Sequence, residues 1–211
     1  MEIEVTQSGV EDTSQRVARR GLLAVGIGGA AMSLLPLLSG RADAADSTTT
    51  APPKRPTTDD VTLLATAQQV ELAATKLYGD AITNVKGWSD DQAAVMVAMR
   101  EAHLAFANSL SGLLGKPAPG TPLEALLTAA GPGFQGDPTA VIKAAADLES
   151  TAVATHTDVL SKLQGVNGAA LIASIQVAEA RHTTVLRDLA GSTDLAELLV
   201  DTEAASLLGN G

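Results

Sequence analysis

The residues of this chain that could do chemistry are glutamates and histidines at helical spacing. Glu179 and His182 stand three positions apart, so a carboxylate and an imidazole would point the same way from one α-helix. His103 also stands three positions after Arg100, where a basic residue takes the place of an acid. Carboxylates and imidazoles are ligands for transition-metal ions, but Glu and His also meet at this spacing by chance. The Glu179–His182 pair alone does not distinguish these two readings.

Two further glutamates extend the pattern into a repeat. Glu71 precedes His103 by 32 residues, and Glu149 precedes His182 by 33 residues. The flanking sequences agree as well, since residues 70–74 (VELAA) resemble residues 148–152 (LESTA). Two helix pairs with matching marked positions indicate an internal duplication.

Composition excludes several other classes of function. The chain has 14 Lys and Arg residues against 24 Asp and Glu residues, and its net charge of −10 repels nucleic acid. Cysteine is absent, which excludes disulfides and thiolate metal ligands. The sequence also has no glycine-rich phosphate loop and no serine nucleophile motif. We therefore expect no nucleic-acid partner and none of the common enzyme classes that these motifs mark.

The first 44 residues have the successive parts of an export signal. A polar, basic segment ends in the pair Arg19-Arg20, and residues 21–40 that follow are apolar and uncharged. Ala42 and Ala44 then supply the small residues of a cleavage site. The arginine pair resembles the twin-arginine signal, so we expect export to the periplasm, the cell envelope or the medium. The alternative is an uncleaved membrane anchor, because about 20 apolar residues can just span a bilayer.

The rest of the chain divides into a linker, a helical domain and a tail. Residues 45–58 are rich in Ser, Thr and Pro and predict an extended or disordered linker. Helical apolar spacing, with capping residues before it and glycines after it, predicts four long helices, over residues 59–85, 89–114, 137–163 and 168–190. A short crossover helix is expected near residues 121–131, and another in the tail, 192–211. The fold predicted for residues 59–191 is an all-α, antiparallel four-helix bundle.

With these positions on four helices, the chain resembles the ferritin-like di-iron carboxylate proteins, especially their exported bacterial branch. In that family two helices each give one Glu and the other two each give Glu-x-x-His, all directed inward. The resemblance covers roughly residues 60–190 and implies a metal site at the matching positions, which are Glu71, His103, Glu149, Glu179 and His182. The departure from the family pattern is Arg100, which stands where the fourth glutamate should be.

Arg100 changes the charge expected at this site. Three carboxylates and a guanidinium replace four carboxylates, and a guanidinium has no lone pair for a metal ion. Two ions look too many for this charge, whereas one iron or manganese ion on Glu149, Glu179 and His182, with or without Glu71, is reasonable. A di-metal site remains an alternative. So does a metal-free cluster in which Arg100 replaces the metal charge by pairing with the buried acids.

Two functions follow from these outcomes. The first is an exported ferritin-like protein with a degenerate di-iron-type site, which handles iron or manganese or protects against oxidation. The second is a metal-free bundle of the cell envelope that works through partners, among them a second copy of the chain in a homodimer. Whether the protein is an enzyme stays open. Outside the five metal-site positions, we expect His156 to face solvent or a groove and Tyr78 to serve in packing.

Overall fold

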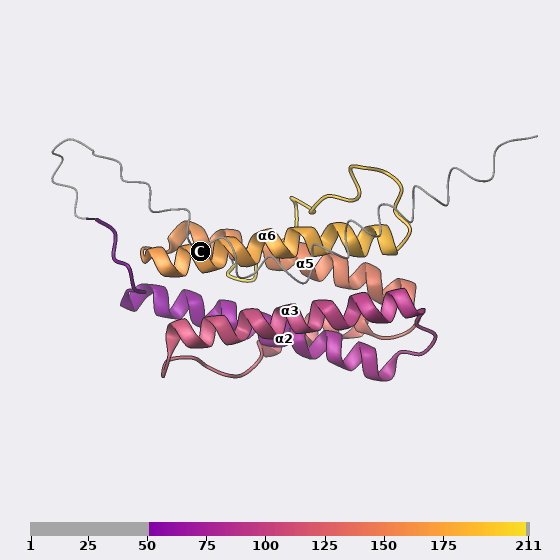
Figure 1. Ribbon diagram of the computed structural model, residues 1–211, viewed down its shortest axis with the longest axis horizontal. Coiled ribbons are helices and arrows are strands. Elements are labelled where there is room, and N and C mark those ends of the chain that lie inside the picture. The colour runs from indigo at the N-terminus through magenta and orange to yellow at the C-terminus, as the bar shows by residue number, and fades with distance from the viewer. Residues whose placement is uncertain (1–50, 210–211) are drawn as a thin grey trace, which may run out of the picture. The chain divides into compact units, whose positions relative to one another are not determined.

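The computed structural model describes residues 51–209, which fold as four long helices with a short helical crossover (Figure 1). The long helices are α2 (Thr58–Asn84), α3 (Asp90–Leu114), α5 (Pro138–Lys162) and α6 (Val166–Leu189). The crossover between α3 and α5 contains α4 (Glu124–Ala130) and the 3-10 helix η1 (Gly131–Phe134). Residues 51–209 include no strand. The all-α four-helix architecture is confirmed.

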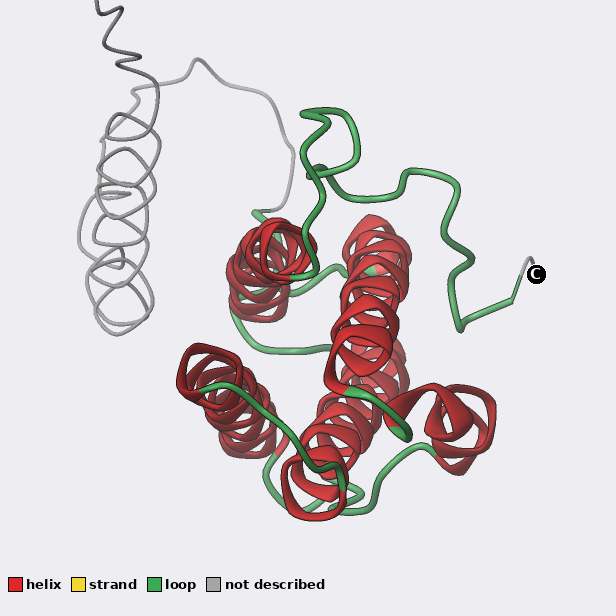
Figure 2. Ribbon diagram, turned by 90° about the vertical axis from the view of Figure 1, so that its right-hand side faces the viewer, coloured by secondary structure: helices red, strands yellow, loops and turns green. Residues whose placement is uncertain are grey.

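The long helices form two antiparallel hairpins. α2 packs along α3 and α5 packs along α6, whereas contacts between the hairpins, of α2 with α5 and of α3 with α6, are less extensive. Figure 1 shows the two hairpins one above the other, and Figure 2 looks along the helices around their common core. Buried alanines, such as Ala74 and Ala81 of α2 and Ala145 and Ala152 of α5, let the helices approach closely.

Three of the long helices begin at the capping residues that the sequence predicts. Thr57 and Ser89 each complete a capping box with the side chain three positions on, and each box satisfies two backbone N–H groups. Asp137 accepts two backbone N–H groups at the start of α5, whose first residue is a proline. These local signals explain why the predicted and observed starts agree.

α6 begins at Val166 rather than near residue 168, because Asp60 of α2 organises its start. The buried Asp60 carboxylate accepts the backbone N–H groups of Gln164 at 2.8 Å, Gly165 at 2.9 Å and Thr57 at 2.7 Å. A Cβ on Gly165 would lie 2.9 Å from Asp60 Oδ2 and 2.7 Å from a backbone carbonyl. Only glycine fits this close approach.

The described part of the predicted linker, residues 51–57, is held against the same end of the bundle. The backbone carbonyls of Pro53 and Lys54 accept the N–H groups of Val166 and Asn167. Donors in the first turn of a helix have no partner within the helix, so this contact caps α6. The last residues of the linker are therefore part of the bundle.

The tail differs from the prediction, because residues 192–209 form turns and no helix. Gly191 has a φ of +93° and follows the last turn of α6. Leu195 and Leu199 are 75% and 60% exposed, so a helix here would have little apolar surface to bury, and short unsupported helices are marginal in water. The tail instead runs past α5, where the N–H of Asp201 donates to Ser150 Oγ.

The predicted signal peptide, with Arg19, Arg20, Ala42 and Ala44, lies outside the described residues. Within the part of the chain that is described, the helices are too short or too polar to cross a membrane.

Asp60→Asn should destabilise the bundle by about 1–3 kcal/mol at neutral pH, because an amide accepts the N–H groups less well and adds donors among them. Burial raises the pKa of Asp60, but the N–H groups of Gln164, Thr57 and Gly165 outweigh it and leave the pKa lowered. A carboxylate with a lowered folded-state pKa stabilises the fold above its unfolded-state pKa, and this stability is lost as the pH falls through the folded-state value. The difference between wild type and variant should therefore shrink in acid.

Urea denaturation at a series of pH values measures both effects. Asp59→Asn is the matched control, since Asp59 is an exposed acid in the same helical turn. It should change the free energy of unfolding by less than about 0.5 kcal/mol. Equal losses for the two variants would show that the helix terminus, and not the contact with the α5–α6 loop, accounts for the stability.

Candidate metal centre

The middle of the bundle contains six buried acids and imidazoles, here called the central cluster. All are fully buried except His182, which is 6% exposed. Apolar core lies on both sides of the central cluster, around Leu64 at one end and around Met96 at the other. The members come from all four long helices and are Glu71 (α2), His103 (α3), Glu149 and His156 (α5), and Glu179 and His182 (α6). The structure thus brings together the five predicted metal-site residues and adds His156.

His103 connects the two hairpins through two carboxylates. Its Nδ1 lies 2.7 Å from Glu71 Oε2, and its Nε2 lies 2.9 Å from Glu149 Oε1. Because each nitrogen faces a carboxylate oxygen, both donate, and the ring is an imidazolium. Burial by itself lowers the pKa of His103, but Glu149 and Glu71 outweigh it and raise this pKa well above its usual value. In the same way, burial raises the pKa of Glu149, but His103 and His182 outweigh it and lower the pKa far below its usual range.

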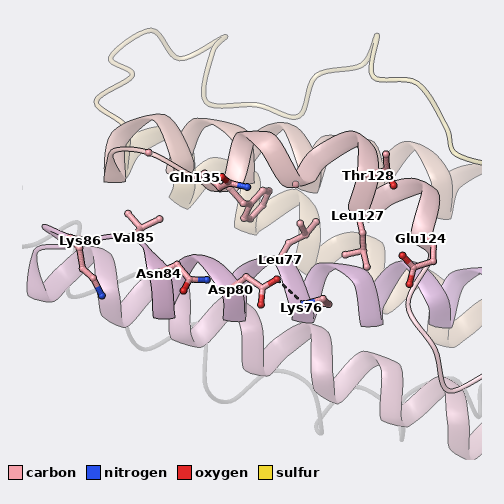
Figure 3. Close-up of a pocket in the computed structure, with 13 residues that line it drawn as sticks. Lys76, Leu77, Asp80, Asn84, Val85, Lys86, Glu124, Leu127, Thr128 and Gln135 are labelled. Atoms are coloured by element: carbon pink, nitrogen blue, oxygen red, sulfur yellow. Dashed lines mark hydrogen bonds and ion pairs between the residues drawn. The ribbon is translucent and has the colours of Figure 1, made fainter.

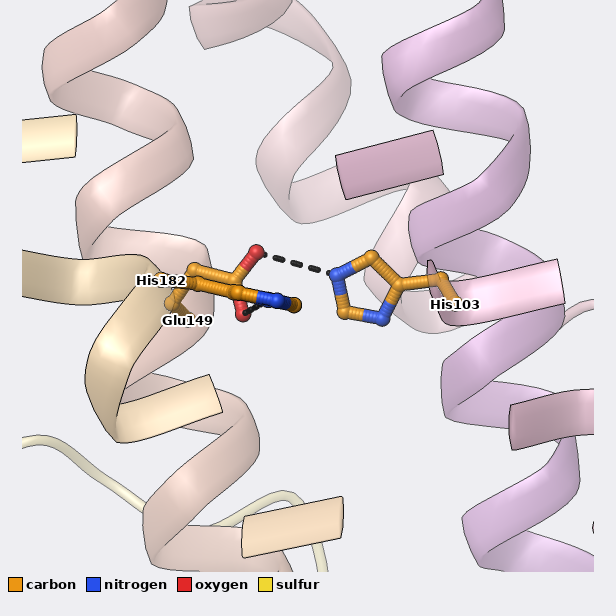
Figure 4. A group of neighbouring side chains, drawn as sticks. All are labelled: His103, Glu149 and His182. Carbon is orange, nitrogen blue, oxygen red and sulfur yellow. Dashed lines mark hydrogen bonds and ion pairs between the residues drawn. The ribbon is translucent and has the colours of Figure 1, made fainter. Parts of the chain in front are cut away.

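His182 approaches the same carboxylate from α6. Its Nδ1 lies 3.3 Å from Glu149 Oε2. Figure 4 shows one oxygen of the Glu149 carboxylate turned toward the ring of His103, and the other next to the ring of His182. Ligand atoms of these three residues lie within 4.8 Å of one another, and so do ligand atoms of Glu71, His103 and Glu179.

His156 is buried, so the expectation that it faces solvent or a groove is wrong. Its Nδ1 lies 2.8 Å from Glu179 Oε2, and its Nε2 lies 3.3 Å from Glu71 Oε1. The sequence carries a signal for this placement, because His156 follows Glu149 by seven residues. Seven residues make nearly two helical turns, which returns to the same face.

Tyr78 has the matching place in the first hairpin, seven residues after Glu71. Its hydroxyl donates to Glu149 Oε1 at 2.5 Å, and its ring stacks on His103 with centroids 5.4 Å apart. Burial, together with the charge of Glu149, raises the pKa of Tyr78 well above its usual value. The phenol therefore stays protonated. Tyr78 packs as expected and also holds one oxygen of Glu149.

Arg100 does not enter the central cluster, so the interpretation that it pairs with the buried acids is wrong. Its side chain is 38% exposed and forms an ion pair with the adjacent Glu101 at the surface. A guanidinium keeps part of its hydration there, whereas full burial would remove it at a cost of several kcal/mol. The buried cation is the imidazolium of His103 instead.

The negative charge of Glu179 is poorly compensated by positive charge nearby. Burial and the neighbouring charges of Glu71 and Glu149 raise its pKa well above the usual value. Burial lowers the pKa of His156, which is therefore neutral. The part of the cluster between Glu71, His156 and Glu179 thus has less positive charge than the part around His103.

A surface hollow also lies where α2 faces α4 and η1 (Figure 3). Its lining includes Asn84, Glu124 and Phe134, and an ion pair of 2.8 Å between Lys76 and Asp80. No member of the central cluster lines this hollow. The groups with metal-binding chemistry are in the core of the bundle.

The fold and the cluster define a class, the antiparallel four-helix bundles in which facing helices direct carboxylates and imidazoles inward. The sequence profile described as the ferritin-like domain matches residues 59–192, more than half of the chain, and the protein therefore belongs to this family. No curated protein and no solved structure matches the chain significantly.

The residues of the central cluster fit a transition-metal ion. Glu71 Oε1, Glu179 Oε1 and His156 Nε2 are buried and have no hydrogen-bond partner among the described residues. Buried polar atoms in native proteins are almost always partnered, so these three atoms are available to a further partner such as a metal ion. Carboxylates and neutral imidazoles are the ligands that iron, manganese and zinc ions accept.

Arg100→Gln should change the free energy of unfolding by no more than about 0.5 kcal/mol, because the side chain lies at the surface. His103→Gln should destabilise the metal-free protein by about 3–5 kcal/mol, because it removes the cation between two buried carboxylates. Chemical denaturation of the chelator-treated proteins measures both. If Arg100→Gln lowered the free energy of unfolding strongly and His103→Gln only slightly, Arg100 and not His103 would be the cation that compensates the buried carboxylates.

Proposed function

We propose that this protein is an exported ferritin-like protein that binds a redox-active iron or manganese ion in the central cluster. The observation that carries the proposal is the convergence of His103, Glu149 and His182, whose ligand atoms lie within 4.8 Å of one another in the core. Membership of the ferritin-like family supports it.

Several residues of the central cluster would together hold such an ion. Glu149 contributes a carboxylate that strongly prefers the charged form, since its pKa is lowered. Tyr78 holds one oxygen of this carboxylate, His103 contacts the same oxygen, and His182 contacts the other. To become a ligand, His103 must release one of its two N–H protons, so metal binding and proton release are coupled.

The candidate metal site is almost completely shielded from solvent. Nearly all of the central cluster is closed to water, and only His182 reaches the surface of the bundle. When bound, iron or manganese supplies one-electron chemistry toward dioxygen or peroxide, which would serve metal handling or oxidative protection. The residues around it exclude bulk water, and His182 is the one member of the central cluster with any exposed surface.

A metal-free bundle of the cell envelope, acting through partner proteins, is the second candidate. The observation that favours it is the position of His103, which bonds Glu71 and Glu149 at once and compensates their charges without an ion. In this version His103 has the role that the sequence suggested for Arg100.

Anaerobic titration with Fe(II) or Mn(II) separates the two candidates. Wild-type protein should retain at least one ion per chain after desalting, measured by atomic emission. Ligand at 100 times its dissociation constant should raise the stability by about 2.7 kcal/mol. Glu149→Gln should abolish retention at the His103 and His182 side, whereas Glu101→Gln, a surface acid, should retain metal like wild type. Failure of wild type to retain either ion would favour the metal-free bundle.

Export rests on the pair Arg19-Arg20 and the small residues Ala42 and Ala44. Replacing both arginines of the pair with lysine should leave the full-length protein in the cytoplasm, because the twin-arginine route depends on the pair and not on charge alone. Arg16→Lys is the control and should be exported normally. Cell fractionation with immunoblotting measures this, and continued export of the double variant would exclude the twin-arginine route.

A further inference from the structure

The tail that follows α6 turns back and runs along the second hairpin (Figure 1). Two of its backbone N–H groups donate to hydroxyl oxygens of α5, that of Asp201 to Ser150 Oγ at 3.3 Å and that of Leu207 to Thr155 Oγ1 at 3.0 Å. Each of these two acceptors is the direct neighbour in the chain of a member of the central cluster. The tail therefore contacts α5 at the level of the central cluster.

The two hydroxyl groups of α5 are arranged to accept from the tail. Their O–H groups are used within the helix, where Ser150 donates to the carbonyl of Ala146 at 3.2 Å and Thr155 to that of Thr151 at 2.7 Å. Both side chains are buried, although an offset of one residue turns each of them about 100° away from the neighbouring member of the central cluster. The tail thus forms part of the cover on this side of α5.

Two adjacent leucines anchor the end of the tail. Leu207 packs against one of the two apolar clusters of the bundle, and Leu208 packs against the other. Because these apolar clusters lie on opposite sides of the central cluster, the leucine pair spans the level at which the central cluster lies. Leu195 and Leu199, earlier in the tail, are 75% and 60% exposed and anchor nothing.

Between its contacts with α5 the tail stands away from the helix. A hollow of about 750 Å³ lies between residues 200–206 and the side chains of Val153, Ala154 and Thr157. The tail forms turns and no helix, so its attachment depends on the two hydrogen bonds and the leucine pair. Segments with few buried apolar contacts and few hydrogen bonds open before the rest of a fold. The tail should therefore detach at a lower cost in free energy than any of the four long helices.

We propose that residues 200–208, here called the strap, are a detachable cover of the central cluster. Closed, the strap shields the α5 side of the cluster, where His156 follows Thr155. Open, it admits small solutes, such as metal ions and peroxide, to that side while the four helices stay packed. The inference deepens the proposed function, because an ion in a closed core needs a way to enter and leave. Its geometry does not depend on whether an ion is bound.

Chemical labelling of the histidines tests the strap without any metal. All three histidines of the chain belong to the central cluster, so their reaction with diethyl pyrocarbonate, followed by peptide mass mapping, reports access to the cluster alone. In the chelator-treated protein, Leu207→Ser combined with Leu208→Ser should raise the labelling rate of His156 about tenfold or more, because the strap loses its apolar anchors. Leu195→Ser combined with Leu199→Ser is the matched control and should keep the wild-type rate, since these leucines are exposed.

The outcomes separate the strap from the proposed function. An unchanged rate at His156 in the variant of Leu207 and Leu208 would overturn the strap, and so would the same increase in the control. Equal increases at all three histidines would also overturn it, because they would report a general loosening of the bundle. Metal retention is measured separately, so a failure of the strap leaves the proposed function standing, and a protein that retains no metal can still have the strap.

Hydrogen exchange in the wild-type protein needs no variant, so it tests the strap even if the leucine variants do not fold. The backbone N–H of Leu207 should exchange more slowly than in an unfolded chain, because it is bonded to Thr155. It should also exchange about tenfold or more faster than the buried N–H groups of α2 and α5. Exchange at the rate of those helical groups would mean that the strap opens only when the bundle unfolds. Exchange at the rate of an unfolded chain would mean that it is not seated on α5, and either result would overturn the inference.

Discussion

The burial of three carboxylates in the middle of an apolar helical bundle is the constraint on which the rest of the structure depends. Glu71, Glu149 and Glu179 are fully buried. Ionised groups in such surroundings destabilise a fold strongly unless they have partners. The partners are three imidazoles, and every long helix contributes at least one member of the cluster. The four helices are therefore held in one register by polar contacts, while apolar packing on either side supplies most of the stability.

Much of the fold could be predicted from the sequence, because its signals are local. Capping residues such as Ser89 and Asp137 act within one turn, so the predicted helix starts agree with the observed ones. The start of α6 was less accurate because its caps come from Asp60 and the chain before α2, more than 100 residues away in sequence. Nothing in a local pattern marks that contact. The short helix expected in the tail is absent over residues 192–209, because leucines there such as Leu195 and Leu199 are exposed and a helix would bury little apolar surface.

The candidate site shows where spacing stops being informative. Spacing of three and seven residues gives the face of a helix, and this sufficed to bring five predicted residues together. It does not say which way a long side chain turns, and Arg100 lies three residues before His103 yet turns toward solvent. The sequence did not predict that His156 would lie in the central cluster, for a different reason. The family pattern has no place for it, although its offset from Glu149 equals that of Tyr78 from Glu71, and that offset was visible in the sequence.

The two hairpins contact each other less extensively than the helices within each hairpin do, and this bears on how two chains could assemble. Each hairpin is tightly packed within itself, and the crossover that joins them spans residues 115–137 with only α4 and η1 as regular structure. A segment of that length can cross to a neighbouring molecule as well as fold back on its own. Two chains that exchanged one hairpin each would rebuild the same polar contacts twice, as in a domain-swapped dimer. The polar cluster therefore specifies which hairpins belong together, but not that they belong to the same chain.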